Sequence, residues 1–412
     1  MRVLICGLNF APEIIGIGKY TGELAQFLSE HGNSIRVVTT PPYYPNWKIQ
    51  VGYSGWRYKK EYWNGITVYR CPLWVPKKPS GIKRIIHLFS FAITSLPVVI
   101  SQVLWKPDLV FVVAPALFSA PGAILLSWII DCKTWLHIQD FELDAAFRMK
   151  LLPGIKILQP LVLVIESTVI RMFHKVSTLS KRMMELLEQK GLPIGRTVLF
   201  PNWVDTRLIY PLAEPSPIHS RFGIQEGKIV VLYSGNMGRK QGLDLLIQTA
   251  KILEEDEDIL FVLCGEGAAR HELELLAQGM HNIKFLPLQP TERLNELLNM
   301  ADIHVLPQRS DAADLVMPSK LTGMLASGKP VITTASPDTE LALELGEVIR
   351  ILPPGDAFAL AEALRYFARD KAAREYQGSL GYSFVLQHWT RDKVLGDILV
   401  KFEHLVHSTK AR

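Results

Sequence analysis

Short runs of apolar and β-branched residues alternate along the whole chain with longer stretches of helical periodicity. In the first half the runs are VLIC, IRVVTT, LVFVV, KTWLHI, KVST and TVLF, and in the second half they are IVVLYSG, ILFVLCG, IKFLP, IHVLP, PVITT and VIRIL. Stretches such as LDLLIQTAKILEE, which lie between them, carry apolar residues at helical spacing. Strands that alternate with helices form parallel sheets, because each return to the next parallel strand must cross a face of the sheet. The sequence therefore predicts an α/β protein with a doubly wound parallel sheet in each half.

The alternation is interrupted between residues 201 and 223, where prolines are frequent and periodicity is weak, as is typical of a linker. We expect two Rossmann-like domains, one over residues 1–203 and one over residues 204–387. The last apolar helical stretch, residues 388–412, has no strand after it, and we expect it to pack back on the first domain. A chain of 412 residues with 48 % apolar content can fill both cores.

Charge is unevenly distributed between the two halves. Residues 1–200 contain 23 Lys and Arg against 12 Asp and Glu, a net +11, whereas residues 201–412 contain 22 against 28, a net −6. A basic first half suits an anionic partner, such as a nucleic acid, a phospholipid surface or a phosphorylated acceptor. A solvated basic face is the alternative.

Four scattered cysteines give neither a disulfide framework nor a zinc site, so a reducing cytosol is expected. They are Cys6, Cys71, Cys132 and Cys264. The first apolar run ends at Gly7 and is shorter than the core of a signal peptide, so it reads as a strand.

Residues 85–105 form an uncharged stretch as long as the roughly 20 residues that a bilayer-spanning helix needs. Polar residues and Pro97 dilute it, so three interpretations stay open: an interfacial helix, a buried core helix and a membrane span. Cations precede it, as they precede many helices that lie on a membrane. We place the membrane or acceptor face of the first domain at Lys77, Lys78, Lys83 and Arg84.

Ligands of open α/β sheets bind at the carboxyl ends of the strands, so the turns after the predicted strands are where sites are expected. After the first strand, Gly16 and Gly18 lead into a helical stretch, and backbone amides there can approach a donor phosphate. A plain turn explains these glycines equally well. The G-x-G-x-x-G fingerprint would need its first glycine at the strand end, where Gly7 is followed by Leu-Asn-Phe, so a nicotinamide-dependent enzyme is disfavoured.

Two strand ends of the second half carry further candidates. The loop after IVVLYSG holds Arg239 and Lys240, a pair suited to a pyrophosphate unless it is a solvated surface pair. The loop after ILFVLCG holds Gly265, Glu266 and Gly267, which are predicted to bind the nucleotide and its ribose. Glu266 can equally cap its own helix.

The segment PSKLTGMLASGKPVI, residues 318–332, is the most informative. Pro318 and Ser319 suit the start of a helix, and Gly328 suits its end. Lys320 then lies in the first turn, where a positive charge opposes the helix dipole. Because an anion at the same place would compensate, we predict that Ser319 and Lys320 bind the donor phosphates.

Polar side chains crowd the end of the run KTWLHI, where His137 is followed by Asp140, Glu142 and Asp144. A histidine in this position can bind or polarise a sugar hydroxyl, so His137 is the candidate catalytic residue. Local spacing gives no metal-ligand geometry, and no metal site is predicted.

Together these stretches resemble the retaining glycosyltransferases of family 4, which share the GT-B architecture of two Rossmann-like domains facing a cleft. The likeness covers nearly the whole chain and rests on the order of NFAPEIIGIGKY, STLSKRMMELLEQKGLP, PNWVD, YSGNMGRKQGLDLLI, VLCGEGAARHELE, ADIHVLP and LASGKPVI. GIGKYTGELA, TTPPYYPNW, LHIQDFELDA and DLVMPSKLTGMLASG are similar to the branch that assembles colanic acid and O-antigen. The resemblance implies transfer of fucose or a related deoxy sugar from a GDP- or UDP-linked donor, with no metal and no other cofactor.

The chain departs from the family pattern in the donor site. The two glutamates common in the family fall on Leu315 and Gly323, so no carboxylate carries over and the catalytic base is unassigned. The family's phosphate-binding Arg falls on Asn236 and its Lys on Gln241, with the two predicted cations of this loop between those positions.

The resemblance also implies a polyprenyl diphosphate-linked saccharide as acceptor. The enzyme would then be cytoplasmic and peripheral at the anionic inner face of the cytoplasmic membrane, with no nucleic acid as partner. Cations that stabilise the departing nucleoside diphosphate would let the acceptor hydroxyl attack without an enzymic nucleophile, while His137 orients donor or acceptor. Two other hypotheses stay open: a noncatalytic GT-B subunit that binds sugar nucleotides, and a sugar-nucleotide epimerase.

Overall fold

The chain folds into two compact units. The computed structural model describes residues 1–14, 16–78, 81–114, 117–141, 159–238, 241–308 and 318–408. Unit 1 comprises Met1–Pro201 and Leu395–Arg412, and unit 2 comprises Asn202–Val394. Both are α/β, as predicted. The boundary falls two residues before the predicted position 203, and the C-terminal segment joins unit 1 from Leu395, seven residues after the predicted 388.

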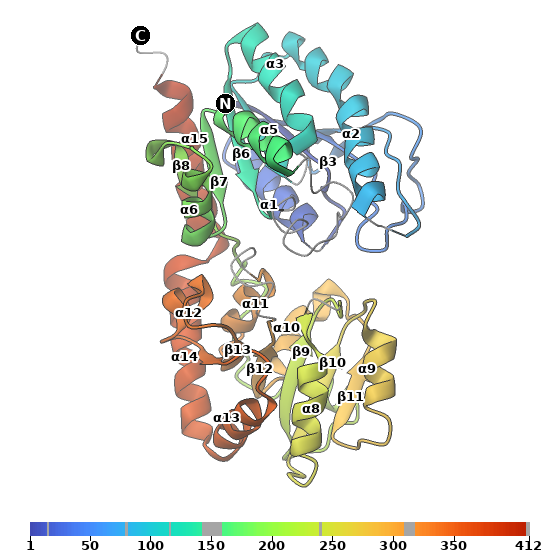
Figure 1. The fold of residues 1–412 in the computed structure, drawn as a ribbon, viewed down its shortest axis with the longest axis vertical. Helices are drawn as coiled ribbons and strands as arrows, with labels where there is room; N and C mark the ends of the chain where they lie inside the picture. The colour runs from blue at the N-terminus through green and yellow to red at the C-terminus, as the bar shows by residue number, and fades with distance from the viewer. Residues whose placement is uncertain are drawn as a thin grey trace. The chain divides into compact units, whose positions relative to one another are not determined.

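Unit 1 is built on an eight-stranded sheet in the order β3-β4-β2-β1-β5-β6-β7-β8 (Figure 1). Neighbouring strands pair in parallel except β3 and β4. The six strands predicted for this half are all present. The strands are β1 (Arg2–Gly7), β2 (Ser34–Thr39), β3 (Lys59–Trp63), β4 (Ile66–Arg70), β5 (Leu109–Ala114), β6 (Lys133–Ile138), β7 (Lys175–Thr178) and β8 (Thr197–Leu199).

The hairpin of β3 and β4 was not predicted. Asn64 and Gly65 connect the two strands with φ values of 46° and 79°, the left-handed geometry of a tight hairpin turn. The Asn-Gly pair between two runs of alternating apolar residues was the available signal.

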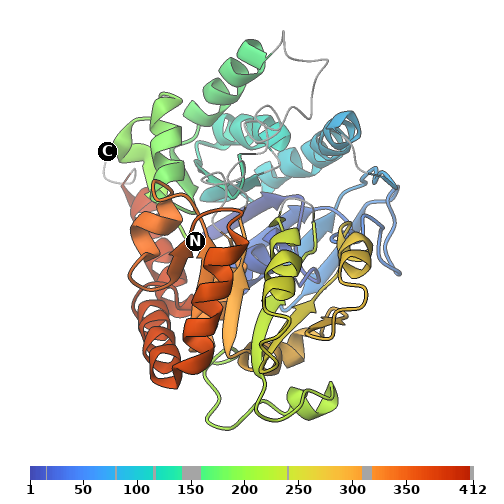
Figure 2. The same ribbon diagram turned by 60° about the horizontal axis from the view of Figure 1, so that its bottom comes forward.

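Helices cover both faces of the unit 1 sheet (Figures 1 and 2). The chain moves from β1 to β2 in one direction across the sheet, and from β4, β5, β6 and β7 to the next parallel strand in the other direction. Right-handed crossovers therefore place α1 on one face and α2, α3, α5 and α6 on the opposite face. The helices are α1 (Ile17–Glu30), α2 (Gly81–Ser101), α3 (Ala120–Ile130), α5 (Gln159–Arg171) and α6 (Lys181–Gln189), with 3-10 turns η1 (Gln102–Leu104), η2 (Leu117–Ser119) and η4 (Ile194–Arg196).

The C-terminal helix α15 (Arg391–His407) begins in unit 2 and ends in unit 1. Its Phe402 is fully buried, with its ring centroid 5.4 Å from that of Phe111 and 4.8 Å from that of Trp135. The end of the chain thus supplies part of the unit 1 core.

Unit 2 is built on a six-stranded parallel sheet in the order β11-β10-β9-β12-β13-β14. These are the six strands predicted for the second half: β9 (Ile229–Ser234), β10 (Ile259–Cys264), β11 (Ile283–Leu286), β12 (Ile303–Leu306), β13 (Val331–Thr334) and β14 (Arg350–Leu352). The helices are α7 (Ile218–Arg221), α8 (Asp244–Ile252), α9 (Arg270–Leu276), α10 (Leu294–Asn299), α11 (Lys320–Ala326), α12 (Glu340–Leu345), α13 (Ala357–Arg369) and α14 (Lys371–His388), with a 3-10 turn η6 (Thr291–Arg293).

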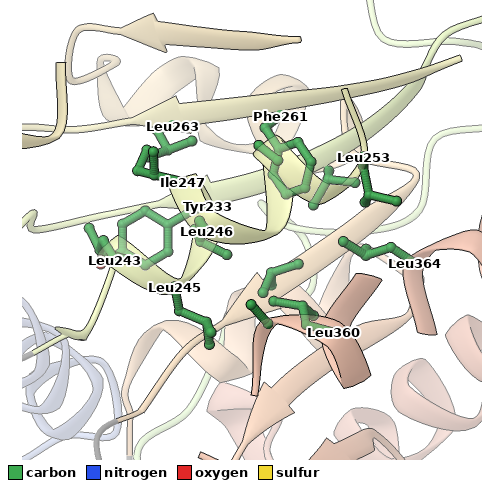
Figure 3. Close-up of a cluster of buried hydrophobic side chains, with 14 of the residues drawn as sticks. Tyr233, Leu243, Leu245, Leu246, Ile247, Leu253, Phe261, Leu263, Leu360 and Leu364 are labelled. Atoms are coloured by element: carbon green, nitrogen blue, oxygen red, sulfur yellow. The ribbon is translucent and has the colours of Figure 1, made fainter. Parts of the chain in front are cut away.

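One face of the unit 2 sheet packs against α8 and α13. Figure 3 shows Ile247 of α8 beside Leu263 of β10, with Leu246 and Phe261 and with Leu360 and Leu364 of α13 in the same cluster. These side chains are at most 6 % exposed. The apolar stripe of LDLLIQTAKI, which indicated a helix, is therefore the surface that buries this face.

Removal of the Phe402 ring tests the role of the C-terminal helix. Because the ring fills space between Phe111 and Trp135, we expect Phe402→Ala to destabilise unit 1 by about 3–5 kcal/mol. Urea unfolding followed by near-ultraviolet circular dichroism measures the loss. Val400→Ala on the same helix is the control, since Val400 is 63 % exposed, and equal stability of the two variants would contradict this packing.

Candidate functional site

The two central strands of the unit 2 sheet, β9 and β12, are neighbours from which the chain departs in opposite directions. It runs from β9 to β10 on one side and from β12 to β13 on the other. The loops that follow the two strands therefore diverge and leave a crevice at the carboxyl edge of the sheet. An open pocket of about 220 Å³ lies beside these loops, and its lining includes Asp244, Gln248, Pro307, Gln308 and Gly355.

The side chain of Lys320 lies across the end of β9. Lys320 is the first residue of α11, so the predicted helix start is correct. Its Nζ donates a hydrogen bond of 2.7 Å to the hydroxyl of Tyr233 and lies 4.2 Å from the centroid of that ring. Gly235 leaves the necessary space, because a Cβ at that position would lie 3.0 Å from Nζ. The Tyr233 hydroxyl in turn donates to the carbonyl of Asn236 at 2.7 Å. The position of the ammonium is therefore fixed by a side chain of β9.

Loss of solvation lowers the pKa of Lys320 to about 8. Burial also raises the pKa of Tyr233, so this hydroxyl remains protonated and neutral at physiological pH. Among the described residues, no carboxylate is hydrogen-bonded to Nζ of Lys320. Its hydrogen-bond partner there is the phenol oxygen of Tyr233. An anionic ligand would favour the charged form of this lysine.

The loops that follow β9 and β10 are in direct backbone contact. The Met237 amide donates to the Glu266 carbonyl at 2.8 Å, and the Ala269 amide donates to the Met237 carbonyl at 2.9 Å. A Cβ on Gly265 would lie 1.9 Å from the Gly235 carbonyl oxygen, and one on Gly267 would lie 2.4 Å from that of Met237. Gly265 and Gly267 are therefore required for loop packing, whatever they do for a ligand.

Glu266 does not cap its helix. Its carboxylate is 60 % exposed and accepts a 2.8 Å bond from the Arg270 guanidinium, which also donates to the Gly265 carbonyl at 2.6 Å. The predicted role of Glu266 is to accept hydrogen bonds from a ribose. Its carboxylate would have to do so while it is paired with Arg270.

The remaining predicted donor-site residues, and the two positions on which the family's glutamates fall, lie in three places. Ser319 is the exposed N-cap of α11, and its carbonyl accepts from the Thr322 hydroxyl at 2.9 Å. Gly323 lies within α11, with Leu298 3.3 Å from where its Cβ would be. The predicted Arg239 and Lys240, and Leu315 at the other usual glutamate position, lie outside the described residues.

In unit 1 the turn after β1 is organised by a carboxylate that the sequence did not single out. Gly16 has φ 62° and is the exposed N-cap residue of α1, whereas Gly18 is buried in its first turn. A Cβ on Gly18 would lie 2.7 Å from that of Glu13. Glu13 itself is only 3 % exposed. Its carboxylate accepts hydrogen bonds from the Tyr43 and Tyr44 amides, both at 2.9 Å, and so links this turn to the segment after β2. Burial raises the pKa of Glu13 despite these bonds.

His137 lies inside unit 1. The ring is 4 % exposed, its Nδ1 is 2.9 Å from the Ser177 hydroxyl, and its centroid is 4.7 Å from that of Phe200. Burial lowers its pKa to about 3, so the imidazole is neutral at physiological pH. His137 lies within β6, which continues to Ile138, and it shares a face of the sheet with the buried Trp135, because residues two apart in a strand point to the same side. Such surroundings are those of a core histidine, and they give no support to the predicted catalytic role.

The predicted cationic face surrounds the start of α2. Lys77, Lys78, Lys83 and Arg84 are all exposed. The Arg84 guanidinium lies 5.6 Å from the centroid of Trp47. The helix that follows, Gly81–Leu104, is long and apolar enough to cross a bilayer, and 28 % of its most apolar window is buried. Within the described parts of the chain, no three His, Cys, Asp or Glu side chains come together as metal ligands.

Both units match families of known proteins. Residues 216–384 match the family described as "Glycosyl transferases group 1", and residues 16–203 match the "Glycosyl transferase 4-like domain". A putative colanic acid biosynthesis glycosyl transferase of Escherichia coli, WcaI, is 39 % identical over 411 residues, which cover 95 % of this chain and 99 % of the relative. The chain belongs to glycosyltransferase family 4. The resemblance expected from the sequence is therefore confirmed.

The architecture of this family 4 glycosyltransferase is shared by solved structures. Sucrose-phosphate synthase of Thermosynechococcus elongatus superposes with a TM-score of 0.78 at 17 % identity, covering 99 % of this chain and 100 % of that one. HepE of Anabaena, solved with UDP and glucose, superposes with a TM-score of 0.70 at 14 % identity, covering 98 % and 99 %. These similarities confirm the predicted GT-B fold.

Gly265→Ala tests the contact between the two strand-end loops of this family 4 glycosyltransferase. Because the added methyl group would overlap the Gly235 carbonyl, we expect a loss of about 2–4 kcal/mol in the stability of unit 2. Gly396→Ala is the control, since its added Cβ would have no atom within 4 Å apart from the adjoining backbone of its own helix. Urea unfolding compares the two variants, and a Gly265→Ala protein as stable as the control would refute the packing.

Lys320→Ala tests whether the buried ammonium serves catalysis. One preorganised charge contact is worth a factor of about 10² to 10³, and we expect kcat/KM for the donor to fall by that much. The pKa near 8 predicts that donor affinity falls as pH rises through 8, because the lysine loses its proton. Lys320→Arg is the control: its guanidinium stays charged, so its affinity profile should be flat across this range. Wild-type and Lys320→Arg profiles of the same shape would remove Lys320 from the phosphate site.

Proposed function

We propose that the protein transfers a sugar from a nucleoside-diphosphate donor to a lipid-linked glycan, with retention at the anomeric carbon. Fucose or a related deoxy sugar is the favoured group, carried by GDP or UDP. The similarity to the Escherichia coli colanic acid biosynthesis glycosyl transferase supports a bacterial surface polysaccharide of the colanic-acid type as the product, and O-antigen is the related alternative. One observation supports the proposed donor site most directly. The Lys320 ammonium is fixed at the end of β9 in unit 2, where the chain departs from β9 and β12 in opposite directions, and unit 2 matches the "Glycosyl transferases group 1" family.

The chemistry follows from charge development at the leaving group. As the bond between the anomeric carbon and the phosphate oxygen breaks, negative charge grows on the departing diphosphate. A cation fixed in advance stabilises that charge without having to reorganise, and this is the role we propose for Lys320. Arg239 and Lys240 follow β9 in the sequence and are proposed as further cations of the same site. With the charge neutralised in this way, the reaction would need no metal ion.

The acceptor half of the proposal concerns unit 1. The turn at Gly16 and Gly18 lies at the carboxyl end of β1, the edge where ligands of such sheets bind, and we propose that it contacts a donor phosphate, as the sequence predicts. The exposed cations at the start of α2 suit a polyprenyl diphosphate and the anionic lipids around it. We therefore propose a peripheral location on the cytoplasmic face of the inner membrane.

A noncatalytic sugar-nucleotide-binding subunit is the second candidate. Gly323 favours it, because the family commonly has a glutamate at this place in the helix after β12. A sugar-nucleotide epimerase is the third, and formation of a new glycosidic bond would exclude it.

A ligand panel followed by a transfer assay tests the proposal. A nucleotide present at 100 times its dissociation constant should stabilise the protein by about 2.7 kcal/mol, so thermal shifts with GDP, UDP and their sugars would identify the base. The best donor, radiolabelled in its sugar, is then offered to membranes of a strain that lacks this protein, and label is measured in the organic-solvent extract.

We expect lipid-extractable label with the wild-type protein and about 10² to 10³ times less with Lys320→Ala. Donor binding without transfer to any lipid fraction would favour the noncatalytic subunit. The absence of a shift with every nucleotide would refute both binding hypotheses.

A further inference from the structure

Helix α2 has an apolar stripe on its outer side. Its inner side, formed by His87, Phe91, Ser95 and Val99, is buried against unit 1. The outer stripe has large apolar residues spaced by four and three in turn, each between 41 % and 66 % exposed: Ile82, Ile86, Phe89, Ile93 and Leu96. The helix of an α/β layer needs only its inner side to be apolar. The outer stripe therefore calls for an apolar partner outside the unit.

The two helices that follow α2 in the same layer are also apolar on the outside. Helix α3 contains no charged residue, and its Leu125, Trp128 and Ile129 are 42 %, 70 % and 52 % exposed. Helix α5 exposes large apolar side chains in the same way, with fractions between 54 % and 59 % for Leu161, Val164 and Ile165.

All three helices lie on one face of the unit 1 sheet, and α2 and α3 are in direct contact. The ring of Phe89 in α2 lies 6.5 Å from that of Phe118, just before α3, and a Cβ on Gly122 of α3 would lie 3.2 Å from Leu96. Figure 1 shows α2 and α3 side by side. Because all three helices cross the same face of the sheet, their outer stripes form one surface, which we call the three-helix face.

The exposed charges within the three helices have one sign, and the exposed carboxylate of Asp131, the C-cap residue of α3, lies just beyond the end of that helix. The helices α2, α3 and α5 contain a single carboxylate, Glu166, which is 6 % exposed and pairs with Lys190 at 2.6 Å. The exposed ions of α2 are Lys83 and Arg84, both at its first turns. No exposed carboxylate of these helices would repel an anionic surface, and cations beside an apolar stripe suit phospholipid headgroups.

We infer that the three-helix face lies flat on an anionic phospholipid bilayer, with α3 and α5 inserted beside α2 and with Trp128 at the headgroup level. Tryptophan favours that level because its ring is apolar and its N–H is polar. Helix α2 lies along the bilayer because its inner side stays packed on unit 1. This deepens the proposed function by naming the lipid-facing residues, and it rests on that function only for the identity of the acceptor. A single helix could cover a stripe spaced by four and three, but a face three helices wide fits a bilayer better than one partner helix.

Paired substitutions test each helix separately. The variants are Ile86→Ser/Ile93→Ser on α2, Trp128→Ser/Ile129→Ser on α3 and Leu161→Ser/Val164→Ser on α5. Partition into the membrane is measured by sedimentation with sucrose-loaded vesicles that contain phosphatidylethanolamine and phosphatidylglycerol in a ratio of about 3:1, so that the surface is anionic. Each pair should weaken partition about 10- to 100-fold, because two apolar side chains leave the membrane.

The matched control is Leu275→Ser/Leu276→Ser on α9 of unit 2, where the two side chains are 59 % and 56 % exposed. It should bind vesicles like the wild type. Near-ultraviolet circular dichroism, which reports on the buried Trp135 of unit 1, checks that the three paired variants are folded, and nucleotide-induced thermal shifts check unit 2 in the α9 control. Wild-type partition by the α3 and α5 pairs would overturn the inference, as would equal loss in the α9 control.

Trp128→Phe keeps the apolar character and separates insertion from loss of structure. With brominated phosphatidylcholine in the vesicles, this variant should partition within about twofold of the wild type but lose part of the tryptophan quenching. Quenching equal to that of the wild type would place Trp128 away from the lipid.

A second copy of the chain is the other possible occupant of the three-helix face. Dimers that form without lipid as the protein concentration rises, and that are lost in the three paired variants, would assign the face to a second copy and refute binding to the bilayer. Vesicle binding without sugar transfer would refute the proposed function and leave this face intact, whereas transfer with no effect of the α3 and α5 pairs would refute the inference alone.

Discussion

Parallel strand pairing is the constraint on which the rest of the structure depends. Each return to the next parallel strand must cross the sheet through a helix, and right-handed crossovers fix the face on which that helix lies. In unit 2 the direction changes between β9 and β12, and the resulting crevice holds Lys320. In unit 1 the same rule gathers α2, α3 and α5 on one face. The proposed donor site and the apolar outer surface are thus two results of one winding rule.

Lys320 shows how an unfavourable local interaction can serve a site. A lysine at a helix start opposes the helix dipole, and loss of solvation lowers its pKa to about 8. The Tyr233 hydroxyl and ring give this ammonium a fixed position but no compensating negative charge. A diphosphate would supply that charge, so the interaction that is missing without a ligand is the one that a donor would make. Gly235 contributes by leaving the space that the lysine side chain fills.

Periodicity and turn residues predicted most of the fold because strand and helix patterns are local. All twelve strands expected from apolar runs are present, and α11 begins at Lys320 as its cap residues indicated. The hairpin of β3 and β4 was missed although Asn64 and Gly65 carried its signal. The surroundings of individual site residues were harder to predict, because they depend on segments distant in sequence. Burial of His137 depends on Phe200, and the contact of Lys320 with Tyr233 joins residues 87 positions apart. Gly265 was expected to admit a ligand, but the space that a side chain would need is occupied by the Gly235 carbonyl.

The path of α15 has a consequence for dissecting the enzyme. Unit 1 is discontinuous in sequence, since Phe402 from the end of the chain completes a core begun by Phe111 and Trp135. A fragment that stops at Pro201 would leave those two rings without their covering helix and would be prone to aggregate. An autonomous unit 1 would therefore need a gene in which a linker replaces unit 2 and joins residues 1–201 to residues 395–412.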